Sequence, residues 1–343
     1  MNETDVPSDL AVVIGRFQPF HYGHLALLEH ALGLAPRALL ILGSARGPRM
    51  VKNPFSFEER SATILASLSA EQRARVSCAG VRDYYDEPRW AAAVKAAVAR
   101  ETSGSVALVG FRKDDSSSYL SLFPEWREVA LPRQAPIDGT ALRRSYFASD
   151  VSSHALPEEL TKAVPAPVAD FLVAFRKRPE FAALREELVA LDDNALRWGT
   201  GPFVTVDAVV RRGEQLLLIQ RGRPPGKGQW ALPGGFLEGS ERLLTGAIRE
   251  LREETQLTCS DDELRQALRG VAVFDHPQRS QRGRTITHAH YFDLPPGARP
   301  EVSGADDAEA ARWAPLAGLC DRTQELFEDH FQIIDHFLKI SRD

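Results

Sequence analysis

The feature that most limits the fold of this chain is the stretch LAVVIGRFQPFHYGH, which covers residues 10–24. Its first five residues, Leu10–Ile14, form an apolar run typical of a buried parallel strand. Gly15 ends the run, and a helical pattern begins near residues 21–24 after a short loop. A strand, a glycine turn and a helix N-terminus together present free backbone N–H groups to an anion. The stretch therefore predicts an α/β fold with a phosphate site near its start.

Residues 10 to about 145 continue this alternation of strands and helices. Ala38–Leu42 and Val106–Val109 are apolar runs that predict buried strands, and residues 58–70 and 89–100 predict helices. Strands that alternate with helices form a parallel sheet, and its ligands bind beyond the carboxyl ends of the strands. We therefore expect a parallel α/β domain whose binding loops directly follow these strands.

Three side chains in the opening stretch suit a phosphate ligand. Arg16 supplies a fixed cation, and His21 and His24, three residues apart at the start of the helix, share one face. The string GRFQPFHYGH resembles the HxGH signature of the nucleotidylyltransferase superfamily, and within it the archaeal-type nicotinamide mononucleotide (NMN) adenylyltransferases. The resemblance implies a Rossmann-like domain that binds ATP and NMN.

Further segments of the first domain fit the same resemblance. IDGTALRR, residues 137–144, is similar to the family's second signature, so we expect Arg143 to meet the triphosphate. Asp138 stands where the family usually has Ser and can still cap the helix. RDYYDEPRW, residues 82–90, resembles the segment that places a Trp against the nicotinamide ring, although a core position for Trp90 is the alternative. The nucleotide-binding residues implied in this way are Gly15, Phe17, Arg46, Asn53, Trp90, Gly110 and Thr140.

The mechanism that the resemblance implies is a direct displacement, in which the 5′-phosphate of NMN attacks the α-phosphorus of ATP and pyrophosphate leaves. No protein nucleophile is needed, so positioning and charge stabilisation carry the reaction. We expect Arg16, His21, His24 and Arg143 to stabilise the phosphates. Mg²⁺ is expected to arrive with ATP, because no segment offers a tight metal cage. Nicotinate mononucleotide stays open as an alternative substrate.

A helical stretch separates this domain from a second one. Residues 165–198 carry a helical pattern interrupted by prolines, and GTGP follows at 199–202. Two apolar runs, Phe203–Val210 and Gln215–Gln220, then predict a pair of strands. We expect a first domain at residues 1–180, a helical linker at 181–200 and a second domain at 201–343.

Three glutamates of the second domain predict a metal site. Glu250, Glu253 and Glu254 stand at positions i, i+3 and i+4, so they share one helical face and repel one another without a cation. Oxygen-only ligands indicate Mg²⁺ or Mn²⁺ rather than Zn²⁺. Such ions bind a diphosphate and activate water for attack on phosphorus. A solvated acidic helix face is the alternative on these three residues alone.

The surrounding stretch GFLEGSERLLTGAIRELREETQL, residues 235–257, is similar to the Nudix box and departs from it at one position, where Gln256 replaces Gly. The resemblance implies an α/β/α Nudix fold with a mixed sheet. Glu250, Glu253 and Glu254 would hold the metal, and Glu253 and Glu254 belong to the implied catalytic set. Gln256 suits a left-handed helix end less well than Gly, at a cost of about 1 kcal/mol, so the end of the helix is in question.

The downstream segment VFDHPQRSQRGRTITHAHYF, residues 273–292, resembles ADP-ribose pyrophosphatases fused to NMN adenylyltransferases and related Nudix regulators of NAD metabolism. The resemblance implies hydrolysis of ADP-ribose to AMP and ribose 5-phosphate. Two alternatives stay open: a domain that senses ADP-ribose or another NAD metabolite without cutting it, and a hydrolase of another nucleoside diphosphate. The residues implied to bind the substrate are Gly235, Arg249, Arg282 and Arg284.

Composition narrows the partners of the chain. Its 343 residues carry a net charge of −5, so no global basic field favours nucleic acid. The N-terminal apolar run is too short for a membrane segment, and the three cysteines show no disulfide or metal spacing. We therefore expect a cytoplasmic enzyme with small-molecule substrates. The apolar positions of a closing helix, about 323–340, suit packing within the domain or against a second subunit.

Overall fold

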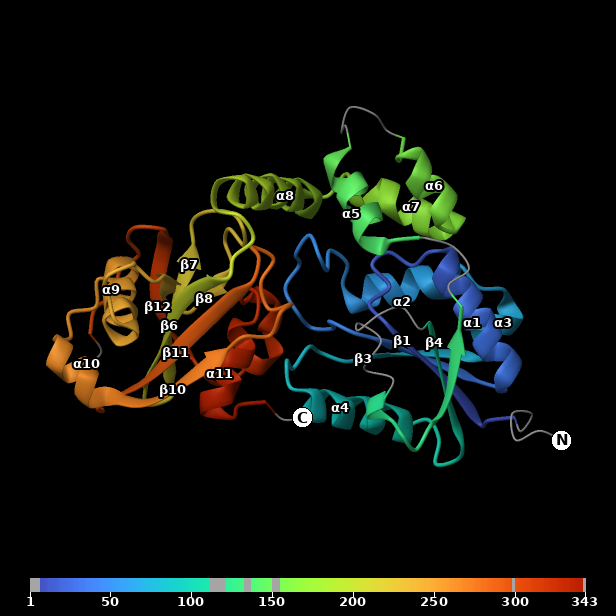
Figure 1. Cartoon of the computed structure of the whole chain (residues 1–343), viewed down its shortest axis with the longest axis horizontal. Coiled ribbons are helices and arrows are strands. Elements are labelled where there is room, and N and C mark those ends of the chain that lie inside the picture. Colours follow the sequence, from blue (N-terminus) through green and yellow to red (C-terminus); the bar gives the residue numbers. More distant parts are fainter. Residues whose placement is uncertain (1–6, 112–120, 133–136, 150–154, 298–299, 342–343) are drawn as a thin grey trace. The chain divides into compact units, whose positions relative to one another are not determined.

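The computed structural model describes residues 7–111, 121–132, 137–149, 155–297 and 300–341. The chain divides into two compact units, Met1–Arg185 and Glu186–Asp343, and Figure 1 shows each unit built around its own sheet. In the described part of the chain, no helix is both long enough and apolar enough to cross a membrane.

The first unit contains a five-stranded sheet in the order β3-β2-β1-β4-β5, in which every neighbouring pair is parallel. Its strands are β1 (Leu10–Gly15), β2 (Ala38–Leu42), β3 (Val76–Gly80), β4 (Val106–Phe111) and β5 (Arg127–Leu131). The three central strands are almost wholly buried, as their apolar runs predict. The predicted parallel α/β fold is confirmed.

Helices connect these strands, and several begin at capping residues. Ser56 forms a capping box at the start of α2, and Asp86 caps α4. Phe181 of α8 packs against Tyr146 and Phe147, with ring centroids 5.1 and 5.4 Å away, so the start of α8 belongs to the core of this unit. The helices are α1 (Tyr22–Leu34), α2 (Phe57–Ala66), α3 (Ala70–Ala74), α4 (Glu87–Ala99), α5 (Gly139–Ala148), α6 (Glu158–Ala163), α7 (Ala166–Phe175) and α8 (Pro179–Trp198), which continues into the second unit.

The strand order changes direction at the centre of this sheet, between β1 and β4. In open parallel sheets, the crevice beyond the carboxyl ends of two such strands receives the ligand. The loop after β1 holds residues 16–21 and leads directly into α1. The topology therefore places the predicted phosphate-binding stretch at this crevice.

The second unit contains a seven-stranded mixed sheet. Five strands follow the order β10-β11-β6-β7-β12, while β8 pairs with β7 and β9 pairs with β6. β11 and β6 are parallel, and the other pairs are antiparallel. The predicted pair of strands at 203–210 and 215–220 is confirmed as β6 and β7. The strands are β6 (Phe203–Arg212), β7 (Gln215–Arg221), β8 (Trp230–Ala231), β9 (Gly234–Phe236), β10 (Leu268–Phe274), β11 (Thr285–Leu294) and β12 (Ala308–Pro315).

Helices cover both faces of this mixed sheet (Figure 1). Val210, Leu251 and Leu264 share a core on the face of α9 and α10, whereas Val209 and Ile334 share a core on the face of α11. Val209 and Val210 are neighbours that point to opposite faces, because side chains alternate along a strand. The predicted α/β/α arrangement is confirmed. The helices are α9 (Leu243–Thr255), α10 (Asp261–Ala267) and α11 (His330–Leu338).

The closing stretch differs from the single helix expected at about 323–340. A 3₁₀ turn at Thr323–Glu325 comes first, and α11 begins only at His330. Glu328, between them, has a φ of +41°, in the left-handed region that a right-handed helix cannot include. The expectation of one continuous helix was therefore wrong, and the break frees the side chains of Glu328 and Asp329 for contacts outside the helix.

Two candidate active sites

The loop between β1 and α1 brings two histidine rings together. His21 is the N-cap of α1, and its Nδ1 accepts a hydrogen bond from the backbone N–H of His24 at 3.3 Å. The rings stack with their centroids 3.6 Å apart and their planes 19° from parallel. The predicted shared face of the pair is present, and it lies at a helix N-terminus that favours an anion.

Phe17 supports these histidines in a strained backbone conformation. Its φ is +52° although it is not glycine, its side chain is 2% exposed, and its ring centroid lies 4.8 Å from that of His24. A Cβ on Gly15 would lie 3.0 Å from the Phe17 ring, so glycine at the end of β1 lets this ring pack closely. Strain of this kind persists only where the surrounding structure imposes it, and it is typical of functional loops.

Two arginines add positive charge to the same loop. Arg143 of α5 donates to the backbone carbonyl of Gln18 at 2.7 Å and to Thr140 Oγ1 at 3.1 Å. Burial lowers the pKa of Arg143 to about 10, and the nearby charge of Arg16 acts in the same direction. Arg16 Nη1 is buried and makes no hydrogen bond to the described residues. A phosphate would satisfy this donor and relieve the repulsion. As expected, Asp138 caps α5, accepting from the Thr140 N–H at 2.9 Å.

Arg60 anchors this loop through hydrogen bonds. Sequence patterns did not single this residue out. Its Nη1 donates to the backbone carbonyls of Arg16 at 2.7 Å and of Gly43 at 2.8 Å, which ties the loop after β1 to the end of β2. Burial lowers the pKa of Arg60 to about 10. One signal was available in the sequence: Arg60 lies four residues before Ile64 and so shares the buried face of α2.

The other predicted nucleotide-binding residues lie in or after the strands of the same sheet. Asn53 is buried, and its Oδ1 has no hydrogen bond to the described residues, which suits a ligand atom. Trp90 is half-buried and packs against the core of the sheet, so its stacking role stays a prediction. Gly110 is buried in β4, and Arg46 is exposed with a φ of +61°. The predicted loop after β4 falls largely on residues 112–120, outside the described residues.

In the second unit, Arg249 of α9 forms ion pairs with three nearby glutamates. Its guanidinium bonds to Glu241 at 2.7 Å, to Glu253 at 2.8 Å and to Glu250 at 3.0 Å. These bonds, above all the one to Glu241, raise the pKa of Arg249 above its ordinary value. Arg249 therefore orients carboxylates that would otherwise repel one another.

Glu250 and Glu254 lie beside the start of β9, at Gly234 and Gly235. The Gly234 N–H donates to Glu254 at 2.9 Å, and a Cβ on Gly235 would lie 2.6 Å from Glu250 Oε1, so glycine there leaves room for the carboxylate of Glu250. Burial, with a smaller contribution from the charge of Glu250, raises the pKa of Glu254 to about 8. A divalent cation would stabilise both carboxylates, and their oxygen donors fit Mg²⁺ or Mn²⁺.

Within the described ranges, no three His, Cys, Asp or Glu side chains are already gathered as a metal cluster. Glu253 and Glu250 both accept a hydrogen bond from Arg249 Nη1, at 2.8 and 3.0 Å. The predicted ligand set of Glu250, Glu253 and Glu254 therefore stays a prediction. Asp306, in the loop before β12, brings a further carboxylate near Glu250. Burial raises the pKa of Glu250, and the charges of Glu253 and Asp306 raise it further.

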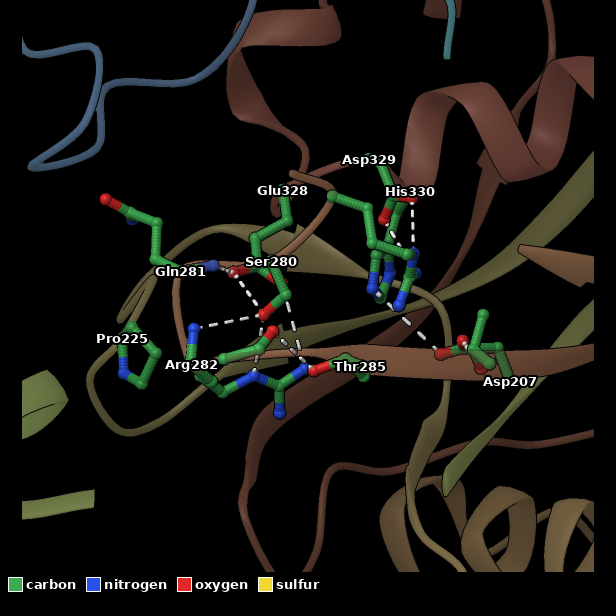
Figure 2. A network of polar contacts seen from close by, with 12 residues as sticks. Asp207, Pro225, Ser280, Gln281, Arg282, Thr285, Glu328, Asp329 and His330 are labelled. Atoms are coloured by element: carbon green, nitrogen blue, oxygen red, sulfur yellow. Dashed lines mark hydrogen bonds and ion pairs between the residues drawn. The ribbon is translucent and has the colours of Figure 1, made fainter. Parts of the chain in front are cut away.

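A buried network of polar side chains joins the segment before β11 to the start of α11 (Figure 2). Arg279 and Asp329 form an ion pair with two hydrogen bonds of 2.8 Å, and their side chains are 3% and 2% exposed. Glu328 accepts from Ser280 Oγ and from the Gln281 N–H, each at 2.9 Å. Arg279 is thus occupied by Asp329 in the interior of the unit.

His330 connects this network to the glutamate site. Its Nδ1 accepts from the Leu232 N–H at 2.8 Å, and its Nε2 lies 4.0 Å from Asp207 Oδ1. Figure 2 shows His330 and Asp207 pointing toward one another. Burial lowers the pKa of His330 to about 3 and raises that of Asp207. Asp207 of β6 is paired with Gly234 of β9, so the network adjoins the strand whose Gly234 N–H donates to Glu254.

Comparisons with known proteins give matches for both units. Residues 201–337 match the NUDIX domain family, and residues 12–82 match the cytidylyltransferase-like family. The crystal structure of a bifunctional NMN adenylyltransferase/ADP ribose pyrophosphatase from Francisella tularensis is 34% identical, with a TM-score of 0.88 over 97% of this chain and 99% of that chain. This chain belongs to the same bifunctional family.

The relatives of each half agree with this assignment. A nicotinamide/nicotinic acid mononucleotide adenylyltransferase from Acinetobacter baylyi is 37% identical over 191 residues, covering 55% of this chain and 97% of that protein. An ADP-ribose pyrophosphatase from Methanocaldococcus jannaschii is 33% identical over 138 residues, covering 40% of this chain and 74% of that protein. The predicted family resemblance is thus confirmed for both halves.

This member of the bifunctional family accommodates the one departure from its Nudix box. Gln256 lies just after α9 with a φ of +52° and a ψ of +27°, in the left-handed conformation that usually selects Gly. Its Oε1 accepts from Ser303 Oγ at 3.2 Å. The backbone N–H of Ser303 also donates to the Thr255 carbonyl at 3.0 Å, which anchors the loop before β12 to the end of α9. The helix therefore ends where the box predicts.

The two arginines predicted to bind the Nudix substrate have different surroundings. The Arg282 guanidinium lies over the rings of Phe236 and Phe327, at 5.7 and 5.5 Å from their centroids. Phe236 is half-exposed and directly follows Gly235, so this group borders the site. Arg284, which lies just before β11, instead donates to the backbone carbonyl of Asp275. The substrate roles of both arginines stay predictions.

Arg221 is a site residue that sequence patterns missed. It ends the apolar strand β7, where nothing in the pattern marked it as functional. Its guanidinium lies 4.1 Å from the centroid of the Phe327 ring, and its Nε donates to the Pro225 carbonyl at 2.9 Å. The charge of Arg221 lowers the pKa of Glu254, so Arg221 contributes positive charge to the glutamate site.

Proposed function

We propose that the first unit transfers the adenylyl group of ATP to NMN, giving NAD and pyrophosphate, and that the second unit hydrolyses ADP-ribose to AMP and ribose 5-phosphate. The chain is a bifunctional NMN adenylyltransferase and Nudix ADP-ribose pyrophosphatase, as its family membership supports. The single observation that carries the proposal is that one chain holds both the stacked His21–His24 pair and the Glu250–Glu254 cluster.

For adenylyl transfer, we propose that the first unit works by positioning and by charge. The phosphates would lie at the N-terminus of α1, where His21 and His24 face them, with the unpaired Nη1 of Arg16 and the buried Arg143 alongside. The hydrogen bonds of Arg143 hold its guanidinium in position before substrate binds, so little reorganisation is needed in the transition state. No covalent protein intermediate takes part.

For hydrolysis, we propose that Glu250, Glu253 and Glu254 hold Mg²⁺ or Mn²⁺, and that Glu253 and Glu254 belong to the catalytic set. The metal would neutralise the diphosphate and lower the pKa of a bound water. Arg249 orients the carboxylates, and the Gly234 N–H fixes Glu254. A related enzyme from Francisella tularensis has been crystallised with AMP and a Mn ion, which supports the use of a divalent cation.

Purified full-length protein with Mg²⁺ tests the proposal in two separate reactions, one with NMN and ATP and one with ADP-ribose, each followed by chromatography. We expect NAD in the first and AMP in the second. Nicotinate mononucleotide in a third reaction measures the preference between the two mononucleotides. AMP absent from the second reaction, with ADP-ribose still bound, would contradict hydrolysis and favour the sensor alternative.

Two variants test whether the sites act separately. His24→Ala should cut NAD synthesis by about 10²–10³-fold, as expected for losing one charge-stabilising group, while ADP-ribose hydrolysis continues. Glu254→Gln keeps the acceptor for the Gly234 N–H but removes the charge, so it should abolish metal-dependent hydrolysis and leave NAD synthesis unchanged. Equal loss of both activities in either variant would argue against two independent sites.

A further inference from the structure

The short segment between β8 and β9 forms hydrogen bonds to three different elements of the second unit. Leu232 and Pro233 are the two residues between these strands. The Leu232 N–H donates to His330 Nδ1 of α11 at 2.8 Å, and the Pro233 carbonyl accepts from a backbone N–H of β6 at 2.8 Å. The next N–H, that of Gly234, donates to Glu254 of α9 at 2.9 Å. Three successive residues therefore connect α11, β6 and α9.

The Leu232 N–H depends on His330 because it lies outside the strand ladders. The ladder of β8 ends at Ala231, and that of β9 begins at Gly234. Pro233 has no N–H, so Leu232 carries the only backbone donor between the two strands. Leu232 is buried, and a buried N–H without an acceptor costs free energy. The imidazole of His330 supplies the acceptor that this donor needs.

The ring of His330 is held in the tautomer that can accept this bond. Burial lowers the pKa of His330 to about 3, so the ring is neutral at pH 7 and carries one proton. Because Nδ1 accepts, the proton is on Nε2, which lies 4.0 Å from Asp207 Oδ1 (Figure 2). Asp207 is itself held in place by Thr287 Oγ1, which donates to its Oδ2 at 2.5 Å. A carboxyl group on the Nε2 side suits this tautomer.

The start of α11 is attached to β8, so the position of His330 is fixed relative to the segment that it contacts. The Phe327 N–H donates to the Trp230 carbonyl at 2.8 Å, and the His330 N–H donates to the Phe327 carbonyl at 3.0 Å. Leu326 and Trp230 also form a parallel bridge. The rings of Phe327 and His330 pack edge to face with their centroids 5.3 Å apart. The imidazole is therefore in place before any ligand binds.

We propose that His330 is a positioning residue for hydrolysis, which fixes the segment from Leu232 to Gly234 and thereby the Gly234 N–H that orients Glu254. The inference rests on the proposed function, in which Glu254 helps to hold the divalent cation. The role needs the Nδ1 acceptor, because Nε2 takes no part in the bond to Leu232. Replacing a residue that orients a metal ligand without touching the metal typically changes metal affinity or activity by about 10–100-fold.

Two substitutions in the full-length protein separate the two nitrogens of the ring. His330→Asn keeps an acceptor at the place of Nδ1 and removes the Nε2 end, whereas His330→Gln keeps a polar group near Nε2 and places a methylene near Nδ1. We expect His330→Gln to lose about 10–100-fold in the kcat for ADP-ribose hydrolysis and in the affinity for Mn²⁺ alone, measured by electron paramagnetic resonance. His330→Asn should retain most of both. The exposed His336 of the same helix provides the matched control, and His336→Gln should change neither.

A merely structural role predicts the opposite order of the two variants. The smaller Asn leaves a larger cavity than Gln, so His330→Asn would then be the more impaired protein. Equal losses in the Asn and Gln variants, or a wild-type kcat and Mn²⁺ affinity in His330→Gln, would overturn the inference. Failure of the proposed function would instead appear as no AMP from the wild-type protein, and the Mn²⁺ affinities of the variants would still test the positioning role.

The wild-type protein offers a second measurement, which is independent of how well a variant folds. Nitrogen NMR of isotope-labelled protein at pH 7 should show the imidazole of His330 with Nδ1 unprotonated and Nε2 protonated. The opposite tautomer would overturn the inference, because a protonated Nδ1 cannot accept from the Leu232 N–H.

Discussion

Replacing Asp329 with Asn should destabilise the second unit and leave the first unaffected. The change keeps the size of the side chain and removes its charge, so the guanidinium of Arg279, only 3% exposed, loses its hydrogen-bonded counter-ion. Asp329 makes no side-chain cap bond to α11, so the loss reports mainly on the ion pair. Breaking one side of a buried pair costs about 3–5 kcal/mol, a large part of the about 5–15 kcal/mol by which domains are stable.

The two activities report on the two units separately during urea unfolding. With a urea dependence of about 2 kcal/mol per M, a loss of about 3–5 kcal/mol lowers the midpoint for ADP-ribose hydrolysis by about 1.5–2.5 M. The midpoint for NAD synthesis should stay where it is. The double variant Arg279→Met/Asp329→Leu removes both charges and should recover most of the stability.

Two results would refute this reasoning. If Asp329→Asn lowered the free energy of unfolding of the second unit by less than about 1 kcal/mol, the buried pair would contribute no more than an exposed salt bridge does. Equal shifts of both midpoints would show that the two units do not unfold independently, so that hydrolysis no longer reports on the second unit alone.

Three further predictions concern the pH response, the Nudix helix and the mononucleotide. His330 has a folded pKa of about 3, below its unfolded value of about 6.5, so the unfolded chain takes up this proton first. Between pH 7 and pH 5, the second unit of the wild-type protein should therefore lose about 2 kcal/mol more of its free energy of unfolding than that of His330→Gln, as measured by urea midpoints. Equal losses in the two proteins would contradict this prediction. Gln256→Gly should raise the stability of the second unit by about 1 kcal/mol by relieving its positive φ, and a lower midpoint would show that the Ser303 bond outweighs this strain. Trp90→Ala should raise the KM for NMN more than that for ATP; equal effects on both would assign Trp90 to the core.

The sequence predicted those parts of the sites that depend on local structure. The spacing of His21 and His24 and the cap at Asp138 appear in the structure as expected, because neighbours on one turn of a helix meet whatever surrounds them. The position of Gln256 at the left-handed end of α9 also followed from the box alone. The buried strands could be predicted equally well, because short continuous apolar runs are typical of strands buried on both faces.

Contacts between distant segments could not be predicted in the same way. Arg60 meets the carbonyl of Arg16 across 44 residues, and Arg279 meets Asp329 across 50. In the sequence, each of these arginines resembles any solvent-exposed charge, because burial and a partner are properties of the packed chain. The same limit explains why the expected closing helix was broken at Glu328, whose left-handed backbone occurs with contacts to Ser280 and Gln281.

The amino-acid sequence by itself thus determined the two fold classes, the family and the helix faces that carry the proposed catalytic residues, because short-range periodicity and motif spacing encode them. Only the tertiary structure decided which charges are paired in the interior and which donor of Arg16 has no partner among the described residues. The physical reason is that desolvation and pairing depend on what surrounds a side chain in three dimensions, and no local pattern records those surroundings.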